Sequence, residues 1–175
     1  MRLALSICIT FFLLACNNSS DNHEEKYFLN YENGEKYCEG IYLVYSDGGK
    51  TKIGQWRYYF PNGDLKSLVE YNEDYFLGYK YYDEGGILIE SFSQKEGVEL
   101  YSDFYENGNL KKEIVVIIND DGVENKTEKE YYSNGELMVL KEYEDDIQIN
   151  KEKIWNKFGK LVLELQYESG EIIKK

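Results

Sequence analysis

The sequence predicts an all-β fold, an elongated antiparallel meander of repeated β-hairpins with little or no helix outside an N-terminal signal peptide. Three observations predict it: a turn motif recurs at a regular interval, the segments between turns alternate apolar and polar residues, and no window shows a helical period. The chain has 175 residues, of which 42% are hydrophobic and 16% aromatic. It is therefore long enough to bury a core and too apolar to be disordered.

The N-terminal segment predicts export and lipid attachment. An apolar run, Leu3–Leu14, follows the basic Arg2. As a helix this run would rise only about 18 Å, too little for a bilayer core of about 30 Å, so a signal peptide fits better than a membrane span. The tetrapeptide LLAC, which ends at Cys16, resembles a bacterial lipobox. The resemblance implies that Cys16 is acylated and begins the mature chain, whereas the alternative is an ordinary secretory signal.

These observations divide the chain into three parts. Residues 1–15 are assigned to the lipoprotein signal peptide, residues 16–36 to a flexible tether, and residues 37–175 to the repeat domain. The tether assignment rests on the polar stretch NNSSDNHEEK that follows Cys16. A lipid on Cys16 places the protein on a membrane of the cell envelope, and Asn17 after the cysteine favours the outer membrane if the cell is Gram-negative.

The repeated motif is clearest in YYFPNGDL, from Tyr58 to Leu65, which holds the only proline. A glycine recurs about every two dozen residues, with an aromatic residue four positions before it and leucine two positions after it. Five copies fill all three columns, and these are the repeat-defining residues. They are Tyr59, Gly63 and Leu65; Tyr82, Gly86 and Leu88; Phe104, Gly108 and Leu110; Tyr131, Gly135 and Leu137; and Trp155, Gly159 and Leu161.

A three-residue hairpin loop explains the motif. In such a loop a type I turn is followed by a left-handed glycine that forms a bulge. Pro61 suits the second position of the type I turn and Gly63 suits the left-handed position, so Tyr59 would lie opposite Leu65. The alternative is a two-residue type I′ turn on the Asn-Gly pair, which would pair Phe60 with Leu65 and leave the proline in a strand.

Further turns are predicted outside the five copies. SDGG, at Ser46–Gly49, predicts another hairpin before the series, and Glu168–Gly170 predicts a turn between the last two strands. The segment Asn119–Gly122 is interpreted as a polar turn, because it lacks the alternating ligands of a calcium loop. Every second residue from Leu161 to Tyr167 is apolar or aromatic, as expected for a strand with one covered face.

The composition argues against catalysis and against nucleic-acid binding. A net charge of −13 repels polyanions, and the lysines of residues 151–160 are interpreted as a solvated face rather than a basic patch. No catalytic or cofactor motif is present, so no catalytic residue, metal or cofactor is expected. Cys38 has no disulfide partner, and the only histidine, His23, falls in the expected tether. Cys38 is therefore interpreted as a half-buried strand residue rather than a nucleophile.

The five-fold motif resembles the MORN-repeat family, most closely a bacterial variant with units of the form YY-x-N-G-x-L. The resemblance covers roughly Ile41–Lys175, and Gly54-Gln55-Trp56 is similar to the Y-x-G-x-W opening of the better-known form. It implies an elongated, twisted antiparallel meander. Many bacterial proteins of this kind are catalogued as antitoxin components of toxin–antitoxin systems.

We expect a binding or scaffold module rather than an enzyme. Most of the 18 tyrosines suit a thin sheet, because the ring covers neighbours while the hydroxyl stays in water, and the array as a whole is expected to bind an unidentified protein. The alternative is an antitoxin or immunity protein that neutralises a partner toxin. A lipobox argues against a cytoplasmic antitoxin and leaves a periplasmic immunity protein. A carbohydrate-degrading enzyme would require a carboxylate pair in a cleft.

Overall fold

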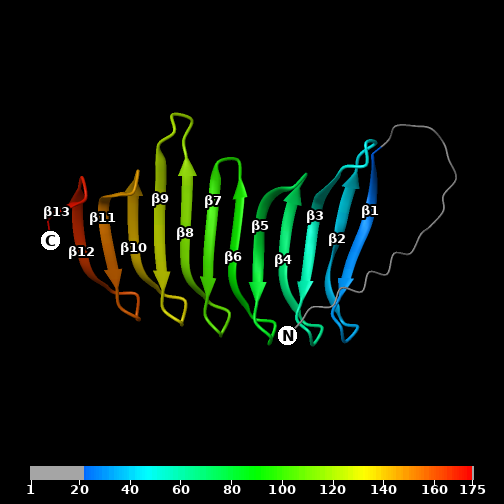
Figure 1. Cartoon of the computed structure of the whole chain (residues 1–175). Coiled ribbons are helices and arrows are strands. Elements are labelled where there is room, and N and C mark those ends of the chain that lie inside the picture. The colour runs from blue at the N-terminus through cyan, green and yellow to red at the C-terminus, as the bar shows by residue number, and fades with distance from the viewer. Residues whose placement is uncertain (1–21, 175) are drawn as a thin grey trace. The chain divides into compact units, whose positions relative to one another are not determined.

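The computed structural model describes residues 22–174, and all regular structure in that range is β-strand (Figure 1). Thirteen strands follow one another there as an antiparallel series, and each strand leads into the next through a tight turn. The predicted all-β meander of hairpins is therefore confirmed. No helix in the described range is long and apolar enough to cross a membrane.

The chain divides into two compact units, Met1–Gly86 and Ile87–Lys175. In the first unit, neighbours in sequence are neighbours in the sheet, and its strands are β1 (His23–Asn30), β2 (Lys36–Val44), β3 (Lys50–Tyr59), β4 (Leu65–Asn72) and β5 (Tyr75–Tyr82). The second unit follows the same rule, with β6 (Leu88–Lys95), β7 (Val98–Phe104), β8 (Leu110–Ile118), β9 (Glu124–Tyr131), β10 (Leu137–Glu144), β11 (Ile147–Trp155), β12 (Leu161–Glu168) and β13 (Glu171–Lys174).

The motif turns are the predicted three-residue loops. After β3, the Phe60 N–H donates to the Asp64 carbonyl at 2.8 Å, and the Gly63 N–H donates to the Phe60 carbonyl at 2.9 Å. Gly63 has a φ of 91°, whereas Asn62 is not among the residues with positive φ. A type I′ turn would require positive φ at both positions, so the bulged loop is confirmed and the alternative is excluded.

The aromatic and leucine columns form cross-strand pairs beside these turns. Tyr59 pairs with Leu65 in the first unit, as predicted. The pairs in the second unit are Phe104 with Leu110, Tyr131 with Leu137, and Trp155 with Leu161. The remaining copy is divided, because Tyr82 belongs to the first unit and Leu88 to the second. The conspicuous motif residues therefore have a structural role.

The turns at the other edge of each unit are mostly of a different kind. Four of them have two central residues with positive φ, the type I′ geometry, at Glu73-Asp74, Glu96-Gly97, Asp145-Asp146 and Ser169-Gly170. The last of these confirms the predicted C-terminal turn. The loops closed by Tyr45 and Gly49 and by Asn119 and Val123 contain three residues. The predicted SDGG hairpin is thus confirmed, and Asn119–Gly122 is a hairpin turn.

The predicted flexible tether over residues 16–36 is wrong from His23 onward. Residues His23–Asn30 form β1, which pairs with β2 along its length, so the repeat domain begins before residue 37. The turn between them is another three-residue loop, with Gly34 at a φ of 86°. The repeated motif does not identify this turn, because Asn30 and Lys36 stand where the motif has an aromatic residue and leucine. Residues 1–21, including Cys16, lie outside the described residues.

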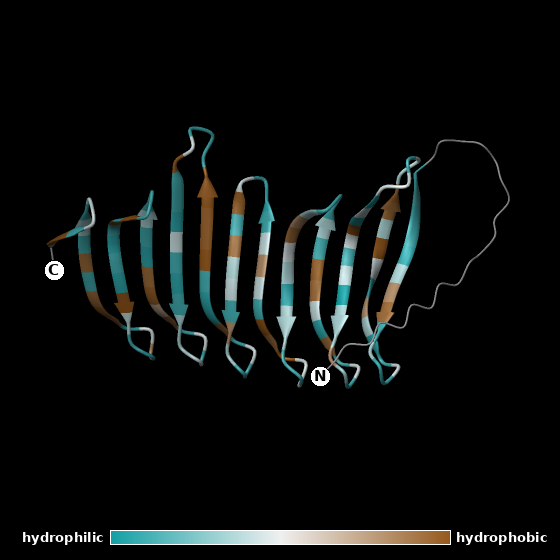
Figure 2. Cartoon of the chain, viewed as in Figure 1, coloured by the Kyte–Doolittle hydropathy of each residue, from teal (hydrophilic) through white to brown (hydrophobic). Residues whose placement is uncertain are grey.

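Within residues 22–174, each unit is a single layer of strands without an enclosed core. Apolar and polar segments alternate along the strands (Figure 2). Few side chains are buried in the described range: Cys38, Val44, Thr51, Trp56 and Ser67 in the first unit, and Phe92, Ser102 and Val116 in the second. Because both faces of a thin sheet lie near solvent, burial depends on neighbouring side chains that cover one another.

Candidate binding surfaces

One face of the first unit is an aromatic cluster around Trp56, which is only 1% exposed. The ring centroids of Trp56 and Tyr42 are 4.9 Å apart at an interplanar angle of 74°, and Tyr27 lies 5.6 Å from Trp56. Such edge-to-face pairs contribute about 0.5–1.5 kcal/mol beyond the area they bury. We call this side of the first unit, defined by Tyr27, Tyr42 and Trp56, the Trp56 face.

The side chain of Lys52 lies over the aromatic rings of the Trp56 face. Its Nζ lies 4.7 Å from the Trp56 ring centroid and 5.0 Å from that of Tyr71, within cation–π range of both. Burial alone would lower the pKa of Lys52, but the neighbouring phenols Tyr58, Tyr71 and Tyr42 raise it above its usual value. The ammonium group therefore stays charged and occupies the space that a ligand cation would need.

Trp56 also rests directly on the backbone of β2. A Cβ on Gly40 would lie 2.2 Å from Trp56 Cδ2, far inside van der Waals contact. The indole Nε1 is buried and has no hydrogen-bond partner among the described residues. The ring is thus held by packing and by the Lys52 ammonium rather than by a hydrogen bond, and the packing leaves no room for a Cβ at Gly40.

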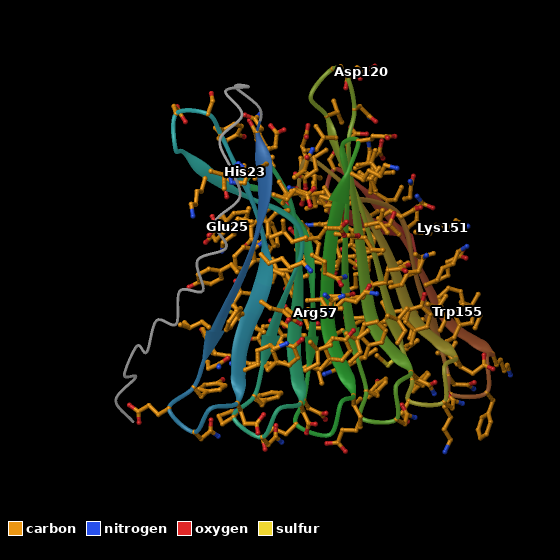
Figure 3. All side chains as sticks on the ribbon, turned by 90° about the vertical axis from the view of Figure 1, so that its right-hand side faces the viewer. His23, Glu25, Arg57, Asp120, Lys151 and Trp155 are labelled. Carbon is orange, nitrogen blue, oxygen red and sulfur yellow. The ribbon has the colours of Figure 1, made fainter. Side chains whose placement is uncertain are left out.

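The opposite face of the first unit carries a broad groove over β1, β2 and β3, with a volume of about 720 Å³. Its wall contains Phe28, which is 49% exposed, together with Ile41 and charged side chains. Arg57 on β3 (Figure 3) is exposed there and is the only arginine among the described residues. Its guanidinium donates to Gln55 Oε1 at 2.6 Å. We call this hollow the Arg57 groove.

Glu39 lines the Arg57 groove and is bonded to two neighbouring side chains. Lys36 Nζ lies 2.7 Å from Glu39 Oε2, and the Tyr59 hydroxyl donates to Glu39 Oε1 at 2.6 Å. These bonds, from Lys36 first and then from Tyr59, hold the pKa of the Glu39 carboxyl below its usual value. Burial and the bond to Glu39 raise the pKa of Tyr59 to about 12. The Glu39 carboxylate is thus held by Lys36 and Tyr59, and Arg57, its cross-strand partner on β3, is the one guanidinium in the described lining of the groove.

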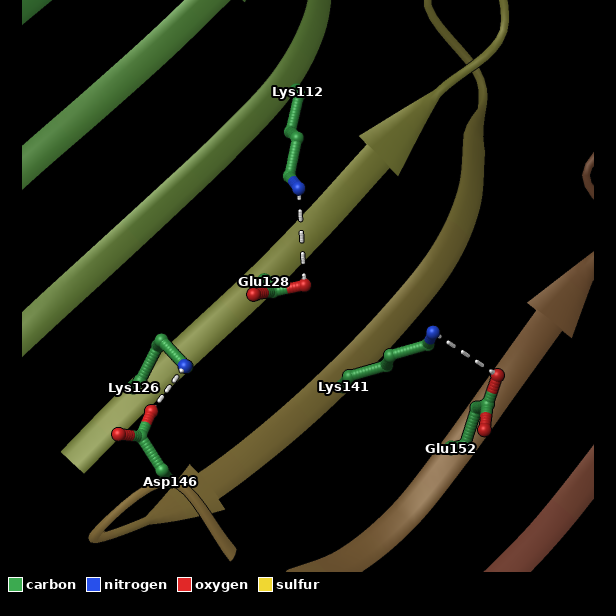
Figure 4. A network of polar contacts seen from close by, with 6 residues as sticks. All are labelled: Lys112, Lys126, Glu128, Lys141, Asp146 and Glu152. Atoms are coloured by element: carbon green, nitrogen blue, oxygen red, sulfur yellow. Dashed lines mark hydrogen bonds and ion pairs between the residues drawn. The ribbon is translucent and has the colours of Figure 1, made fainter. Parts of the chain in front are cut away.

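One face of the second unit instead carries ion pairs between its own side chains (Figure 4). Lys112 Nζ lies 3.9 Å from Glu128 Oε2, and Lys141 Nζ lies 3.7 Å from Glu152 Oε1. Glu128 pairs with Lys141 in register, so basic and acidic residues alternate from β8 to β11. Pairs of this kind contribute at most about 1 kcal/mol each. Because the charges are mutually satisfied, this face offers less free charge to a ligand than the Arg57 groove does.

Neighbouring motif turns are joined by side-chain hydrogen bonds that the sequence analysis missed. The tyrosine three positions before a glycine donates to a carbonyl beside the next turn, and the asparagine just before the glycine donates to a carbonyl within it. The tyrosine bonds are Tyr31 to Tyr59, Tyr105 to Tyr131 and Tyr132 to Trp155, at 2.7–3.0 Å; the asparagine bonds are Asn33 to Pro61, Asn107 to Ser133 and Asn134 to Lys157, at 2.7–2.9 Å. We call this set the turn ladder.

Removing one rung of the turn ladder should lower stability measurably. Tyr105→Phe deletes the hydroxyl that donates to the Tyr131 carbonyl at 2.7 Å and keeps the ring. Because the bond is partly buried, we expect a loss of about 1 kcal/mol in the free energy of unfolding. Urea denaturation would measure it, with Tyr75→Phe, which changes a tyrosine that is 76% exposed, as the matched control. Equal stability of the two variants would show that the rung contributes nothing.

The structure gives nucleophilic chemistry at Cys38 no support. Cys38 lies on β2 and is buried, where desolvation raises the pKa of its thiol. His23 lies on β1, not in a tether, and pairs with Val44, whereas Leu29 pairs with Cys38. The imidazole is thus displaced along the strand by about 20 Å, at about 3.3 Å per residue. Cys38 is a strand residue, as interpreted, although it is buried rather than half-buried.

The structure and the comparison with known families agree on the class of protein. The fold defines an all-β repeat protein whose unit is a hairpin with a bulged three-residue turn. A family model described as the MORN repeat variant matches residues 52–73, 100–116 and 124–145. Each match covers the two strands beside one motif turn, those of Gly63, Gly108 and Gly135. Curated proteins give no match to the chain. The hairpins in these three segments are therefore similar to the MORN repeat variant.

Proposed function

We propose that this protein is a bacterial lipoprotein, held on a membrane of the cell envelope by lipid on Cys16, whose repeat domain binds a partner protein. The domain acts as a scaffold rather than as an enzyme. The lipobox-like LLAC supports the anchor, and the two solvent-facing sides of each unit support a binding role. Outer-membrane placement, in a Gram-negative cell, follows from Asn17 after the cysteine.

The start of β1 sets the distance between anchor and binding surface. Because β1 begins at His23, the spacer after Cys16 reaches at most about 25 Å when fully extended. A lipid on Cys16 would therefore hold the first unit close to the membrane surface. A partner in the same membrane would meet this unit at high local concentration, which strengthens weak contacts.

The Arg57 groove is the observation that carries the binding role. It combines an exposed aromatic ring, Phe28, with an exposed guanidinium. Among residues 22–174, the Arg57 guanidinium donates to the Gln55 amide and lies in no salt bridge with a carboxylate. Aromatic and arginine side chains contribute most to protein interfaces, and guanidinium groups bind carboxylates in a two-pronged geometry. We infer that the partner presents an acidic side chain next to an apolar one.

Photo-crosslinking in native membranes tests this role. A crosslinking amino acid in place of Gln55, which lines the groove, should capture a discrete partner. The same amino acid in place of Asp120, an exposed position in the β8–β9 turn (Figure 3), should not. Arg57→Glu should reduce capture at least about tenfold, because a like charge then faces the partner's acid. Lys95→Glu, at a lysine that is 84% exposed, is the matched reversal and should leave capture unchanged.

Two outcomes of the crosslinking experiment would contradict binding in the Arg57 groove. Capture from Asp120 as efficient as from Gln55 would place the partner outside the groove, and unchanged capture after Arg57→Glu would remove the guanidinium from recognition. Either result would overturn the assignment of the binding surface.

Cys16→Ala should release the protein from the membrane fraction. Loss of the thiol prevents acylation, and each buried methylene of an acyl chain contributes about 0.8 kcal/mol to membrane binding. Fractionation and labelling with a radioactive fatty acid would measure the effect, with Cys8→Ala as the control because Cys8 lies inside the signal segment. An unchanged membrane fraction and unchanged labelling would contradict the anchor.

A second candidate function is that of an immunity protein or antitoxin. The net charge of −13 favours a basic partner, because opposite charge speeds association, and a secreted toxin is one such partner. Recovery of a toxic protein in the crosslinking experiment, together with toxicity in cells that lack this gene, would favour this function over a general scaffold.

A further inference from the structure

Four of the bulged loops contain an asparagine directly before the left-handed glycine. An asparagine side chain reacts most readily with the next backbone nitrogen when that nitrogen belongs to glycine, because glycine has no Cβ to hinder the approach. All four asparagines are exposed to water. Sequence and exposure alone therefore give the four pairs similar reactivity. The pairs are Asn33-Gly34, Asn62-Gly63, Asn107-Gly108 and Asn134-Gly135.

The turn ladder holds three of these asparagines. Nδ2 of Asn33, Asn107 and Asn134 donates to a carbonyl of the next loop at 2.7–2.9 Å. Oδ1 of each accepts the N–H of the second residue after it, at 3.1–3.2 Å. Each side chain is thus fixed between two loops. Its Cγ can approach the glycine nitrogen only after a hydrogen bond to another hairpin breaks, which costs free energy.

Asn62, in the turn between β3 and β4 (Figure 1), is held differently. Its Nδ2 donates to Asp64 Oδ2 at 2.9 Å and its Oδ1 accepts the Asp64 N–H at 3.0 Å, so both bonds stay within its own loop. Phe60 stands where the other three loops have a donating tyrosine, and phenylalanine has no hydroxyl to donate. The Asn62 side chain can therefore rotate without breaking a bond to another hairpin.

We propose that Asn62 is a site of spontaneous deamidation. The Gly63 nitrogen gives up its proton and bonds to Asn62 Cγ, the Cγ–Nδ2 bond breaks, and Nδ2 takes up a proton and leaves as ammonia. Water then opens the cyclic imide. Addition of water at Cγ gives aspartate, whereas addition at the Asn62 backbone carbonyl gives isoaspartate, in which the main chain runs through Cγ. The reaction consumes water only, and nothing is oxidised or reduced.

Asp64 supplies a proton carrier at the reacting amide. Its carboxylate lies 2.9 Å from Nδ2, so it is placed to deliver a proton to the departing nitrogen. The corresponding residue in the Gly108 loop is Asn109, which has no carboxylate. In all four loops the glycine N–H donates to the carbonyl three residues before it, at 2.8–3.0 Å, so that bond slows every pair alike. The carboxylate and the free side chain therefore distinguish Asn62.

The product carries a new negative charge beside two existing carboxylates. Asp64 belongs to the same loop, and Glu35 Oε2 lies 3.4 Å from the position that a Cβ on Gly63 would occupy. Isoaspartate also lengthens the main chain next to Pro61, whose carbonyl accepts the Asn33 rung of the turn ladder at 2.9 Å. Deamidation therefore weakens this rung, and it changes a loop next to Glu35, which lines the Arg57 groove.

Peptide mapping by mass spectrometry tests the site. The full chain in a non-ionic detergent would be kept at neutral pH and body temperature for several weeks. Asn62 should deamidate at least about fivefold faster than Asn107 and Asn134, the ratio expected for one ordinary hydrogen bond. In concentrated urea the turn ladder is lost, and the rates should become similar. Methylation by an isoaspartate methyltransferase gives a second readout and should label the peptide that contains residue 62.

Two variants separate the contributions to the reaction. Asp64→Asn gives the loop the residue that the Gly108 loop has, and it should slow deamidation of Asn62 at least about threefold. Asn62→Gln should abolish the mass gain in this peptide, because the longer side chain cannot close a five-membered imide. Far-UV circular dichroism identifies variants that fail to fold, and for those the rates within the unmodified chain decide.

Three outcomes would overturn the proposal or one of its parts. A rate at Asn62 no faster than at Asn107 and Asn134 in the folded chain would exclude Asn62 as a preferred site. The same order of rates in concentrated urea would assign the difference to the sequence rather than to the turn ladder. An unchanged rate in Asp64→Asn would remove the carboxylate from the reaction.

Discussion

Gly40→Ala is expected to destabilise the first unit by about 3 kcal/mol, the largest effect of a single methyl group that we expect in this chain. The added Cβ would lie 2.2 Å from Cδ2 and 2.4 Å from Cε2 of Trp56. The indole cannot move away easily, because Tyr27, Tyr42 and Lys52 pack against it and it is 1% exposed. The strands must therefore separate or the ring must leave its site.

Two variants separate this clash from a general effect of alanine. Gly85→Ala places a methyl group no closer than 3.3 Å to another atom, at Asp83 Oδ1, and should cost less than about 1 kcal/mol. Trp56→Leu alone should be destabilising, but Gly40→Ala should add little to it, because the clashing ring is gone. Urea denaturation of the unmodified chain, Gly40→Ala, Trp56→Leu and the double variant completes a double-mutant cycle. Additive losses would contradict direct contact as the cause.

The sequence reveals the local repeat better than it reveals contacts between repeats. The bulged turn and the Tyr59–Leu65 pair follow from a proline, a glycine and a fixed spacing, which depend on neighbouring residues only. The first hairpin escaped detection because Asn30 and Lys36 replace the two apolar columns. Yet Tyr31, Asn33 and Gly34 there are the residues that form the turn ladder. A search for tyrosine and asparagine before the glycine would have found it.

The Arg57 groove could not be predicted from the sequence, because its lining residues come from three different strands. Phe28, Ile41 and Arg57 come from three strands, and they gather in one groove only through the register of β1 with β2 and of β2 with β3. That register depends on irregularities, including the shift between Glu39 and Ile41, that no simple alternation predicts. The assignment of residues 16–36 to a tether also removed β1 from consideration, although β1 forms one wall of the groove.

The motif turns and the type I′ turns lie at opposite edges of each unit, and each kind links neighbouring hairpins by different side-chain hydrogen bonds. The motif turns carry the turn ladder, so a change there affects the neighbouring hairpin as well as its own. The type I′ turns carry acidic residues such as Asp74 and Asp145, whose Oδ1 atoms accept the N–H groups of Lys52 and Glu124 on another hairpin. Both edges therefore link successive hairpins through side chains. This arrangement stabilises each layer of strands, because the described part of the chain forms no second sheet for it to pack against.

Gly108→Val is expected to cost about 2 kcal/mol, and the cause would be the backbone alone. Gly108 has a φ of 80°, and a Cβ built on it meets no atom within 4 Å, so no side-chain clash contributes. A β-branched residue in the left-handed region is strained by about 1–2 kcal/mol relative to glycine, because its Cβ makes this backbone conformation unfavourable. The Tyr105 and Asn107 rungs of the turn ladder lie in the same loop and would be displaced with it.

Gly108→Asn is the matched variant, because asparagine tolerates the left-handed conformation better than other residues with a side chain. It should cost less than about 1 kcal/mol, so the difference between the two variants measures backbone strain rather than loss of glycine as such. Denaturation would be followed through Trp155, the only tryptophan of the second unit. Equal losses for valine and asparagine would argue against strain as the cause. Unchanged stability in both would mean that the left-handed turn is not required, and the explanation of the repeated glycine column would fail with it.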